Sequence, residues 1–215
     1  MFILDIFAVD AKPGEVPNTK PKPKDKFRES AECDAVRKEY ADVMKDKPPG
    51  HLPHKREGVY ASEHDINLKP NAEIPRFSGY GGSVASAEIM TQMVKTYAEQ
   101  GYVIPSESKF ASPAILVKKP GGGFRLIIDY RMLNDATLKK SGVPPNIRDI
   151  LNRLHGATTF SIMDLYQGYY LMPMSKESQS KTAFVYKDEL GHTQKYEWTV
   201  MPLGLQGAPS SFQDL

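Results

Sequence analysis

The order of strands and helices predicted along the chain indicates an α+β fold, in which helices pack against an antiparallel sheet. Residues 114–129 and 181–201 each contain two β-prone runs joined by a turn, which is the pattern of a β-hairpin. Helical periodicity appears before the first hairpin and between the two hairpins, and after the second hairpin a loop leads into a helix that begins near Pro209.

The helix before the first hairpin has the clearest periodicity in the chain. Five apolar residues recur at intervals of three and four over residues 83–100: Met90, Met93, Val94, Tyr97 and Ala98. These side chains are expected in the core, and Gly101 supplies a C-terminal stop. Upstream, residues 11–25 are expected to be a flexible lead-in, residues 30–44 a short helix and residues 51–75 an extended stretch.

Between the hairpins, a second helix is expected over residues 147–155, with Asn146 as its N-cap and Gly156 at its end. Its apolar residues share one face, which predicts a buried stripe: Ile147, Ile150, Leu151 and Leu154. A β-prone run, residues 160–163, follows as a buried strand and ends at Asp164.

Asp164 is the residue on which a functional interpretation depends. A carboxylate at the end of a buried strand is costly unless a metal, a cation or a helix N-terminus offsets its charge. Asp164 can therefore be a metal ligand, or it can be an ordinary helix N-cap, a position that Asp favours. The residue by itself does not decide between the two.

Positive charge is concentrated in one segment of a nearly neutral chain. The chain has 28 Lys and Arg residues against 26 Asp and Glu residues, which gives a net charge of +2. Residues 109–153 contain nine basic residues against three acidic ones, a local charge of +6. This segment predicts either a polyanionic partner or an exposed, solvated face.

The single cysteine, Cys33, excludes an internal disulfide framework and is typical of a reducing compartment. No apolar run approaches the ~18–20 residues of a membrane span. Residues 1–9 are apolar but have no basic residues before them and no clear cleavage site, so a secretory signal is not expected. The chain is expected to be intracellular, in the cytoplasm or nucleus rather than secreted, with no membrane partner.

The first hairpin carries features that have two interpretations each. Its turn, residues 120–123, can cradle a phosphate through backbone N–H groups or simply join two strands, and it lacks the Gly-Lys-Ser/Thr of a P-loop. Lys118, Lys119 and Arg125 flank the turn and can clamp a triphosphate or form an exposed face. Tyr169 is equally consistent with ordinary core packing. Zinc-ligand spacing, a Gly-x-Ser-x-Gly elbow and an aspartic protease motif are missing from the sequence.

Taken together and in order, these motifs resemble those of reverse transcriptases. Residues 112–119, the glycine turn and residues 124–134 resemble the fingers hairpin, and residues 160–169 resemble the palm strand that carries the first metal-binding aspartate. Met201-Pro-Leu-Gly204-Leu, Ala208-Pro209 and Phe212-Gln213 follow in the family's order. The chain is similar in particular to the polymerase of gypsy-type long-terminal-repeat retrotransposons over residues 40–213, which implies a right-hand fingers and palm architecture.

The resemblance implies a metal-dependent RNA-directed DNA polymerase. Asp164 would be a ligand of both Mg²⁺ ions in a two-metal nucleotidyl transfer, and the Leu165 carbonyl would assist at one of them. An RNA or DNA template–primer and dNTPs would be the partners of the intact enzyme. The family's other catalytic acids lie in a Tyr-x-Asp-Asp hairpin, a motif that these 215 residues do not contain. The chain is therefore expected to be a fragment that does not polymerise DNA by itself.

The resemblance also implies roles around the nucleotide. Lys119 and Arg125 would neutralise the incoming triphosphate. Tyr169 would stand under the sugar and exclude a 2′-hydroxyl by its bulk. Leu203 and Gly204 would pack near the nucleotide and template. Asp129 and Arg131 would support the fingers hairpin.

Four segments follow from these assignments. Residues 1–45 are a flexible or weakly helical lead-in, and residues 46–108 are an extended lead-in with a helix. Residues 109–158 form the fingers hairpin with its helix, and residues 159–215 form a partial palm. The alternative function is a non-catalytic remnant that binds nucleic acid or another partner through its basic segment. In that case, binding would weaken steeply with salt and would not depend on Asp164.

Overall fold

A computed structural model describes residues 31–41, 63–77, 79–120, 122–139, 146–156, 165 and 167–213. The chain divides into two compact units, one formed by residues 1–49 and 144–168 and the other by residues 50–143 and 169–215. No helix among the described residues is long and apolar enough to cross a membrane. The lead-in over residues 11–25 and the strand over residues 160–163, with Asp164, lie outside the described residues.

The first unit contains two described helices, α1 (Ala31–Glu39) and α4 (Ile147–Arg153). The predicted N-cap of α4 is confirmed, because the Asn146 side chain accepts a hydrogen bond of 3.0 Å from the Arg148 backbone N–H. The predicted buried stripe is wrong for the described structure, since all four of its residues are exposed: Ile147, Ile150, Leu151 and Leu154. The residues flanking α4, 140–145 and 157–164, lie outside the described part of the chain. Periodicity identifies an apolar face but does not specify what covers it.

The second unit is built on a five-stranded sheet with the order β1-β5-β4-β2-β3. Three pairings are antiparallel, and both predicted hairpins are confirmed as β2–β3 and β4–β5. The β2–β4 pairing is parallel, with Ser112 opposite Phe184 and Pro113 opposite Val185, so the sheet is mixed rather than wholly antiparallel. The strands are β1 (Val103–Pro105), β2 (Ser112–Lys118), β3 (Phe124–Ile128), β4 (Phe184–Lys187) and β5 (Thr193–Trp198).

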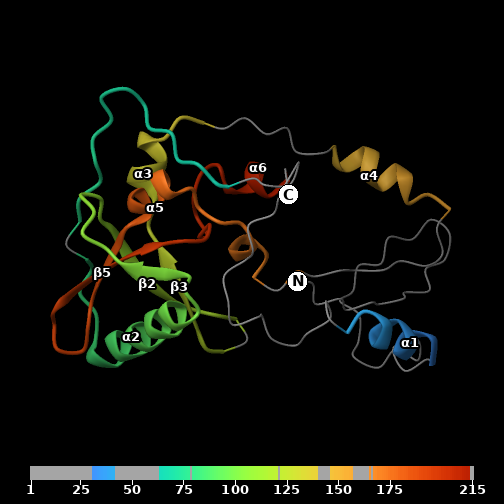
Figure 1. Cartoon of the computed structure of the whole chain (residues 1–215), viewed down its shortest axis with the longest axis horizontal. Helices are drawn as coiled ribbons and strands as arrows, with labels where there is room; N and C mark the ends of the chain where they lie inside the picture. The colour runs from blue at the N-terminus through green and yellow to red at the C-terminus, as the bar shows by residue number, and fades with distance from the viewer. Residues whose placement is uncertain are drawn as a thin grey trace. The chain divides into compact units, whose positions relative to one another are not determined.

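The long helix of this unit, α2 (Val84–Glu99), lies against the sheet through contacts with β1 and β4 (Figure 1). The Ser83 side chain caps its first turn by accepting from the Ser86 N–H at 3.2 Å, and Gly101 follows its end with a φ of 74°. The glycine stop predicted from the sequence is thus confirmed. The other helices are short: α3 (Arg131–Ala136), α5 (Lys176–Gln179), α6 (Ala208–Gln213) and the 3₁₀ turns Gly168–Leu171 and Ser180–Thr182.

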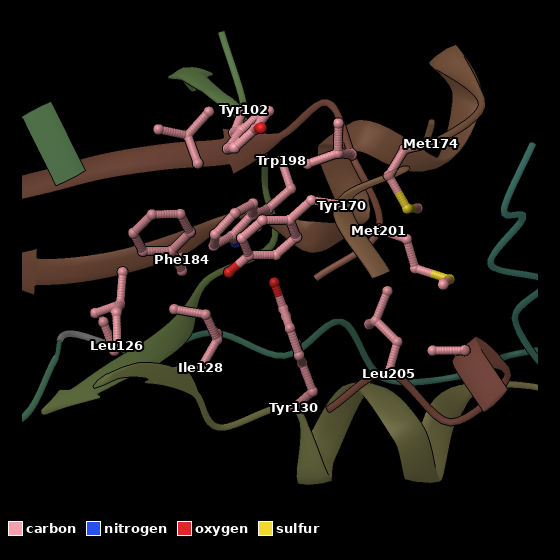
Figure 2. Packing of buried hydrophobic residues seen from close by; sticks show 14 of the residues in the cluster. Tyr102, Leu126, Ile128, Tyr130, Tyr170, Met174, Phe184, Trp198, Met201 and Leu205 are labelled. Carbon is pink, nitrogen blue, oxygen red and sulfur yellow. The ribbon is translucent and has the colours of Figure 1, made fainter. Parts of the chain in front are cut away.

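Aromatic side chains dominate the core of the second unit (Figure 2). The Trp198 ring lies 5.3 Å from the Tyr170 ring and 5.9 Å from the Phe184 ring, measured between centroids. Tyr130 approaches this group from the start of α3, and its buried hydroxyl donates to the Thr182 carbonyl at 2.8 Å. Burial of aromatic rings with a paired hydroxyl contributes strongly to stability, so this cluster holds the sheet, α3 and the loops between them together.

An extended segment, residues 63–68, ties separate parts of the second unit together. The His64 N–H donates to Pro173, and the Ile66 N–H donates to the Ser178 hydroxyl, each at 2.9 Å. Lys181 donates to the Ile66 carbonyl at 2.7 Å. Ile66 is 2% exposed, as its alternation with Asp65 and Asn67 in the sequence predicts.

Candidate functional site

The β2–β3 hairpin presents two of the predicted phosphate-binding residues. Antiparallel pairing places Val117 opposite Arg125 and Lys118 opposite Phe124. The turn closes with the Lys119 N–H donating to Gly123 at 3.0 Å. Lys119 and Arg125 are exposed, while Leu126 and Ile128 point into the core. The hairpin therefore presents these two cationic side chains, together with that of the exposed Lys118, on a strand pair that is anchored at its base.

Beyond β3, Asp129 and Arg131 form an ion pair at the edge of the unit. The Arg131 guanidinium donates to both carboxylate oxygens of Asp129, at 2.8 and 2.6 Å. These hydrogen bonds lower the pKa of Asp129. The Tyr80 hydroxyl is a weaker partner at 3.4 Å. Arg131 itself is held in one orientation but stays open to solvent, with 82% of its side chain exposed.

The loop from Met201 to Gly207 carries two further predicted residues, Leu203 and Gly204. Its N-terminal end is fixed, because Met201 is fully buried and its N–H donates to the Met172 carbonyl at 2.8 Å. Leu203 is 39% exposed at the apex. Gly204 has a φ of +96°, and a Cβ there would lie 3.6 Å from the Ile128 carbonyl oxygen and 3.7 Å from the Tyr130 ring. The loop therefore lies against the base of the β2–β3 hairpin.

The side chain of Asn134 holds this loop from the other side, donating to the Gly204 carbonyl and accepting from the Gln206 N–H. The sequence interpretation assigned no role to Asn134, although the residue ends the motif that resembles the fingers hairpin. The contact spans 70 positions, so sequence spacing contains no signal for it.

Tyr169 stacks on the Phe212 ring of α6, with a centroid separation of 5.1 Å and an interplanar angle of 15°. It is only half-buried, so part of its surface is available to a ligand. Burial raises the pKa of the adjacent Tyr170, and the positive charge of Arg125 acts in the opposite direction.

The structure thus gathers Lys119, Arg125, Tyr169, Leu203 and Gly204 into one compact unit. Leu165 belongs to the other unit, and Asp164 lies outside the described residues, so neither is placed relative to these five. Within the described ranges, no group of three or more His, Cys, Asp and Glu side chains could hold a metal ion.

Two hollows border this part of the second unit. One, of about 350 Å³, lies between the start of α2, strand β2 and the β4–β5 turn, and its walls include Val84, Ile115 and Tyr186. The other, of about 310 Å³, lies between residues 63–67, the end of α3 and the Met201–Gly207 loop, and includes His64, Asn134 and Gln206.

Comparison with known proteins shows which family part of the chain resembles. Residues 117–215 match the family model described as "Reverse transcriptase (RNA-dependent DNA polymerase)". These residues include most of the hairpin, the Tyr169 segment and the Met201–Gly207 loop. This part of the chain is therefore similar to the reverse transcriptase domain found in retroelement polyproteins.

Three relatives to which the chain is similar are themselves polyproteins. The chain is 39% identical over 157 residues to the "Retrovirus-related Pol polyprotein from transposon 297" of Drosophila melanogaster, covering 70% of this chain and 14% of the relative. It is 35% identical over 152 residues to the "Enzymatic polyprotein" of figwort mosaic virus, covering 69% of this chain and 22% of the relative. It is 34% identical over 130 residues to the "Enzymatic polyprotein" of cauliflower mosaic virus (strain D/H), covering 59% of this chain and 18% of the relative. The chain thus spans less than a quarter of each of these polyproteins.

A solved structure confirms the fold. The protease–reverse transcriptase of prototype foamy virus superposes with a TM-score of 0.65, covering 84% of this chain and 23% of that chain at 22% sequence identity. The predicted α+β architecture of polymerase fingers and palm is therefore confirmed, with the parallel β2–β4 pairing as its one revision.

Proposed function

We propose that this chain supplies the fingers and the first part of the palm of a reverse transcriptase from a gypsy-type long-terminal-repeat retrotransposon. The observation that carries the proposal is the packing of Gly204 against the Ile128 carbonyl and the Tyr130 ring. It brings the loop expected to contact the nucleotide onto the hairpin that bears Lys119 and Arg125. The identity with transposon 297 supports the choice of element.

In this proposal each side chain has a distinct task. Lys119 and Arg125 bind the triphosphate of the incoming dNTP through charge-assisted hydrogen bonds. Tyr169, braced by the Phe212 ring, excludes a 2′-hydroxyl by its bulk. Leu203 and Gly204 form the surface beside the nucleotide and template, where the lack of a side chain at Gly204 lets a ligand approach the backbone closely.

Asp164 and the Leu165 carbonyl are proposed as ligands of Mg²⁺, because carboxylate and carbonyl oxygens are ligands that this hard cation prefers. When bound, two such ions stabilise the attacking and leaving oxygens of the displacement. The template–primer is attracted by the exposed basic residues of the second unit, which include Lys118 on β2.

A binding experiment with the 215-residue chain tests this function. A template–primer duplex should bind with an affinity that falls steeply with salt. Replacing Lys119 and Arg125 together by Gln should weaken the binding of a dNTP to this complex by about tenfold or more, because two cations that bind its triphosphate are lost. The matched control is Lys95→Gln, an exposed cation on α2, and it should leave dNTP binding unchanged. Equal dNTP affinities for the double variant and the wild type would contradict the proposal.

The transcript provides a second test. Sequencing beyond the codon for Leu215 should reveal an in-frame Tyr-x-Asp-Asp motif, and Asp164→Asn should then abolish primer extension by the encoded protein. A stop codon at that point, with duplex binding indifferent to Asp164→Asn, would instead support the non-catalytic alternative.

A further inference from the structure

Asn134 links α3 to the loop that carries Leu203 and Gly204. Its side-chain Nδ2 donates to the Gly204 carbonyl at 2.8 Å, and its Oδ1 accepts from the Gln206 N–H at 2.9 Å. A carbonyl only accepts and a backbone N–H only donates, so these two partners determine the orientation of the amide. One side chain therefore satisfies the backbone on both sides of Leu205.

The chemistry of this contact requires an amide. A carboxylate can accept from Gln206 but cannot donate to Gly204, and it would face the carbonyl oxygen with a negative charge. A leucine has a similar size and provides neither bond. The two bonds therefore require a side chain that both donates and accepts hydrogen bonds, which neither Asp nor Leu does here.

The helix that bears Asn134 is itself immobilised at both ends. Tyr130, immediately before α3, is 2% exposed and donates to the Thr182 carbonyl at 2.8 Å. At the other end, the Ala136 carbonyl accepts from the Lys69 N–H at 2.9 Å, and Leu133 within the helix is 1% exposed. Leu205, between the two bonded backbone groups, is 4% exposed in the same core (Figure 2). Asn134 thus connects the loop to a rigid part of the unit.

The apex of the loop depends on this connection. Leu203 and Gly204 are both exposed, and the φ of +96° at Gly204 is maintained by the residues around it. We propose that Asn134 is a positioning residue for the nucleotide site, which fixes the Leu203–Gly204 turn at the height where the incoming dNTP and its template base contact it. This inference rests on the proposed function and assigns to that function a residue that touches neither substrate.

The test measures nucleotide binding and duplex binding separately. The 215-residue chain is bound to a template–primer that has 2-aminopurine as the templating base and a dideoxy-terminated primer, and it is titrated with dTTP in the presence of Mg²⁺. Asn134→Leu should weaken the dTTP-dependent change in fluorescence about tenfold, on the order of the worth of one to two net hydrogen bonds. Asn134→Asp should do the same, while the affinity for the duplex should stay within about twofold of wild type, because the cationic side chains are unchanged.

Amide exchange provides a second measurement that does not depend on nucleotide binding. The Gln206 N–H should be protected in the wild type, should remain protected in Asn134→Asp and should lose protection in Asn134→Leu. The matched control is Asn67→Leu with Asn67→Asp, which makes the same changes at an exposed amide of the same unit.

The outcomes separate the two proposals. If the wild type shows no response to dTTP, the nucleotide site itself is wrong and the positioning role falls with it. If the wild type responds and both Asn134 variants respond equally, only the positioning role is overturned. A loss of duplex and nucleotide binding together, in Asn134 variants but not in Asn67 variants, would indicate a general structural role and would also overturn it.

Discussion

The imidazole Nδ1 of His64 lies 2.9 Å from the hydroxyl Oγ of Ser211, although 147 positions separate the two residues. His64 is 1% exposed and Ser211 is 2% exposed. The pair joins the extended segment at residues 63–68 to helix α6, which also supplies Phe212 as the stacking partner of Tyr169. A contact far from the hairpin thus stabilises the element that supports one of the proposed nucleotide-binding residues.

Ser211→Ala is therefore expected to lower the free energy of unfolding by about 1–3 kcal/mol, because it leaves a buried polar group of His64 with one partner fewer. Urea titration followed by tryptophan fluorescence measures this change, since Trp198 is the only tryptophan and lies in the core. Ser210→Ala, at the neighbouring and more exposed position, serves as the control and should change stability by less than about 0.5 kcal/mol. Equal effects of the two substitutions would show that the His64–Ser211 contact contributes nothing.

Tyr130→Phe should destabilise the second unit by about 1–3 kcal/mol. The substitution removes the hydroxyl hydrogen that the Tyr130 side chain donates and leaves the buried Thr182 carbonyl without it. Tyr80→Phe is the comparison, because Tyr80 is 45% exposed and its hydroxyl makes a long contact of 3.4 Å. A Tyr130→Phe variant as stable as the wild type in urea would contradict the importance of this bond.

Stability should fall as the pH rises above about 10. Burial raises the pKa of Tyr130 and Tyr170 well above the ordinary value of 10.0, and it raises the pKa of Tyr186 to about 12. Above pH 10 the unfolded chain loses these protons while the folded chain retains them, so the free energy of unfolding decreases with pH. Each tyrosine that ionises only in the unfolded state adds a slope of about 1.4 kcal/mol per pH unit.

Urea titrations in steps of ~1 pH unit, at about pH 9, 10 and 11, measure how the free energy of unfolding changes with pH. Tyr186→Phe should make the decrease shallower between pH 10 and about 12, the interval set by the raised pKa of Tyr186. A stability that is constant over the window would mean that these phenols are not held in their neutral form by burial.

Gly204→Ala should destabilise the chain by about 1–2 kcal/mol, because an L-residue with a side chain rarely adopts a φ of +96°. The added Cβ would make only ordinary contacts with Ile128 and Tyr130, so strain in the backbone rather than crowding is the cause. Gly81→Ala is the matched control, since its backbone lies outside the left-handed region and a Cβ there would meet nothing within 4 Å. The result is checked by thermal unfolding, and equal midpoints for both variants would contradict the assignment of strain.

The amino-acid sequence by itself determined the local elements and the order of the motifs that resemble those of reverse transcriptases. The spacing of Met90, Met93, Val94 and Tyr97 predicted α2, and the side chains of Ser83 and Asn146 cap helices at the expected ends. The glycine turn predicted the β2–β3 hairpin. These features depend on residues close together in the chain, where periodicity, capping and turn geometry act directly.

Only the tertiary structure decided how these elements meet. The parallel pairing of β2 with β4, the Asn134 clamp over 70 positions and the His64–Ser211 contact over 147 positions all join distant segments. Exposure of the apolar face of α4 likewise departs from what its periodicity predicted. The physical reason is that hydrogen-bond partners and packing partners are chosen by the shape of the folded core, whereas a local pattern specifies only which face or group requires a partner.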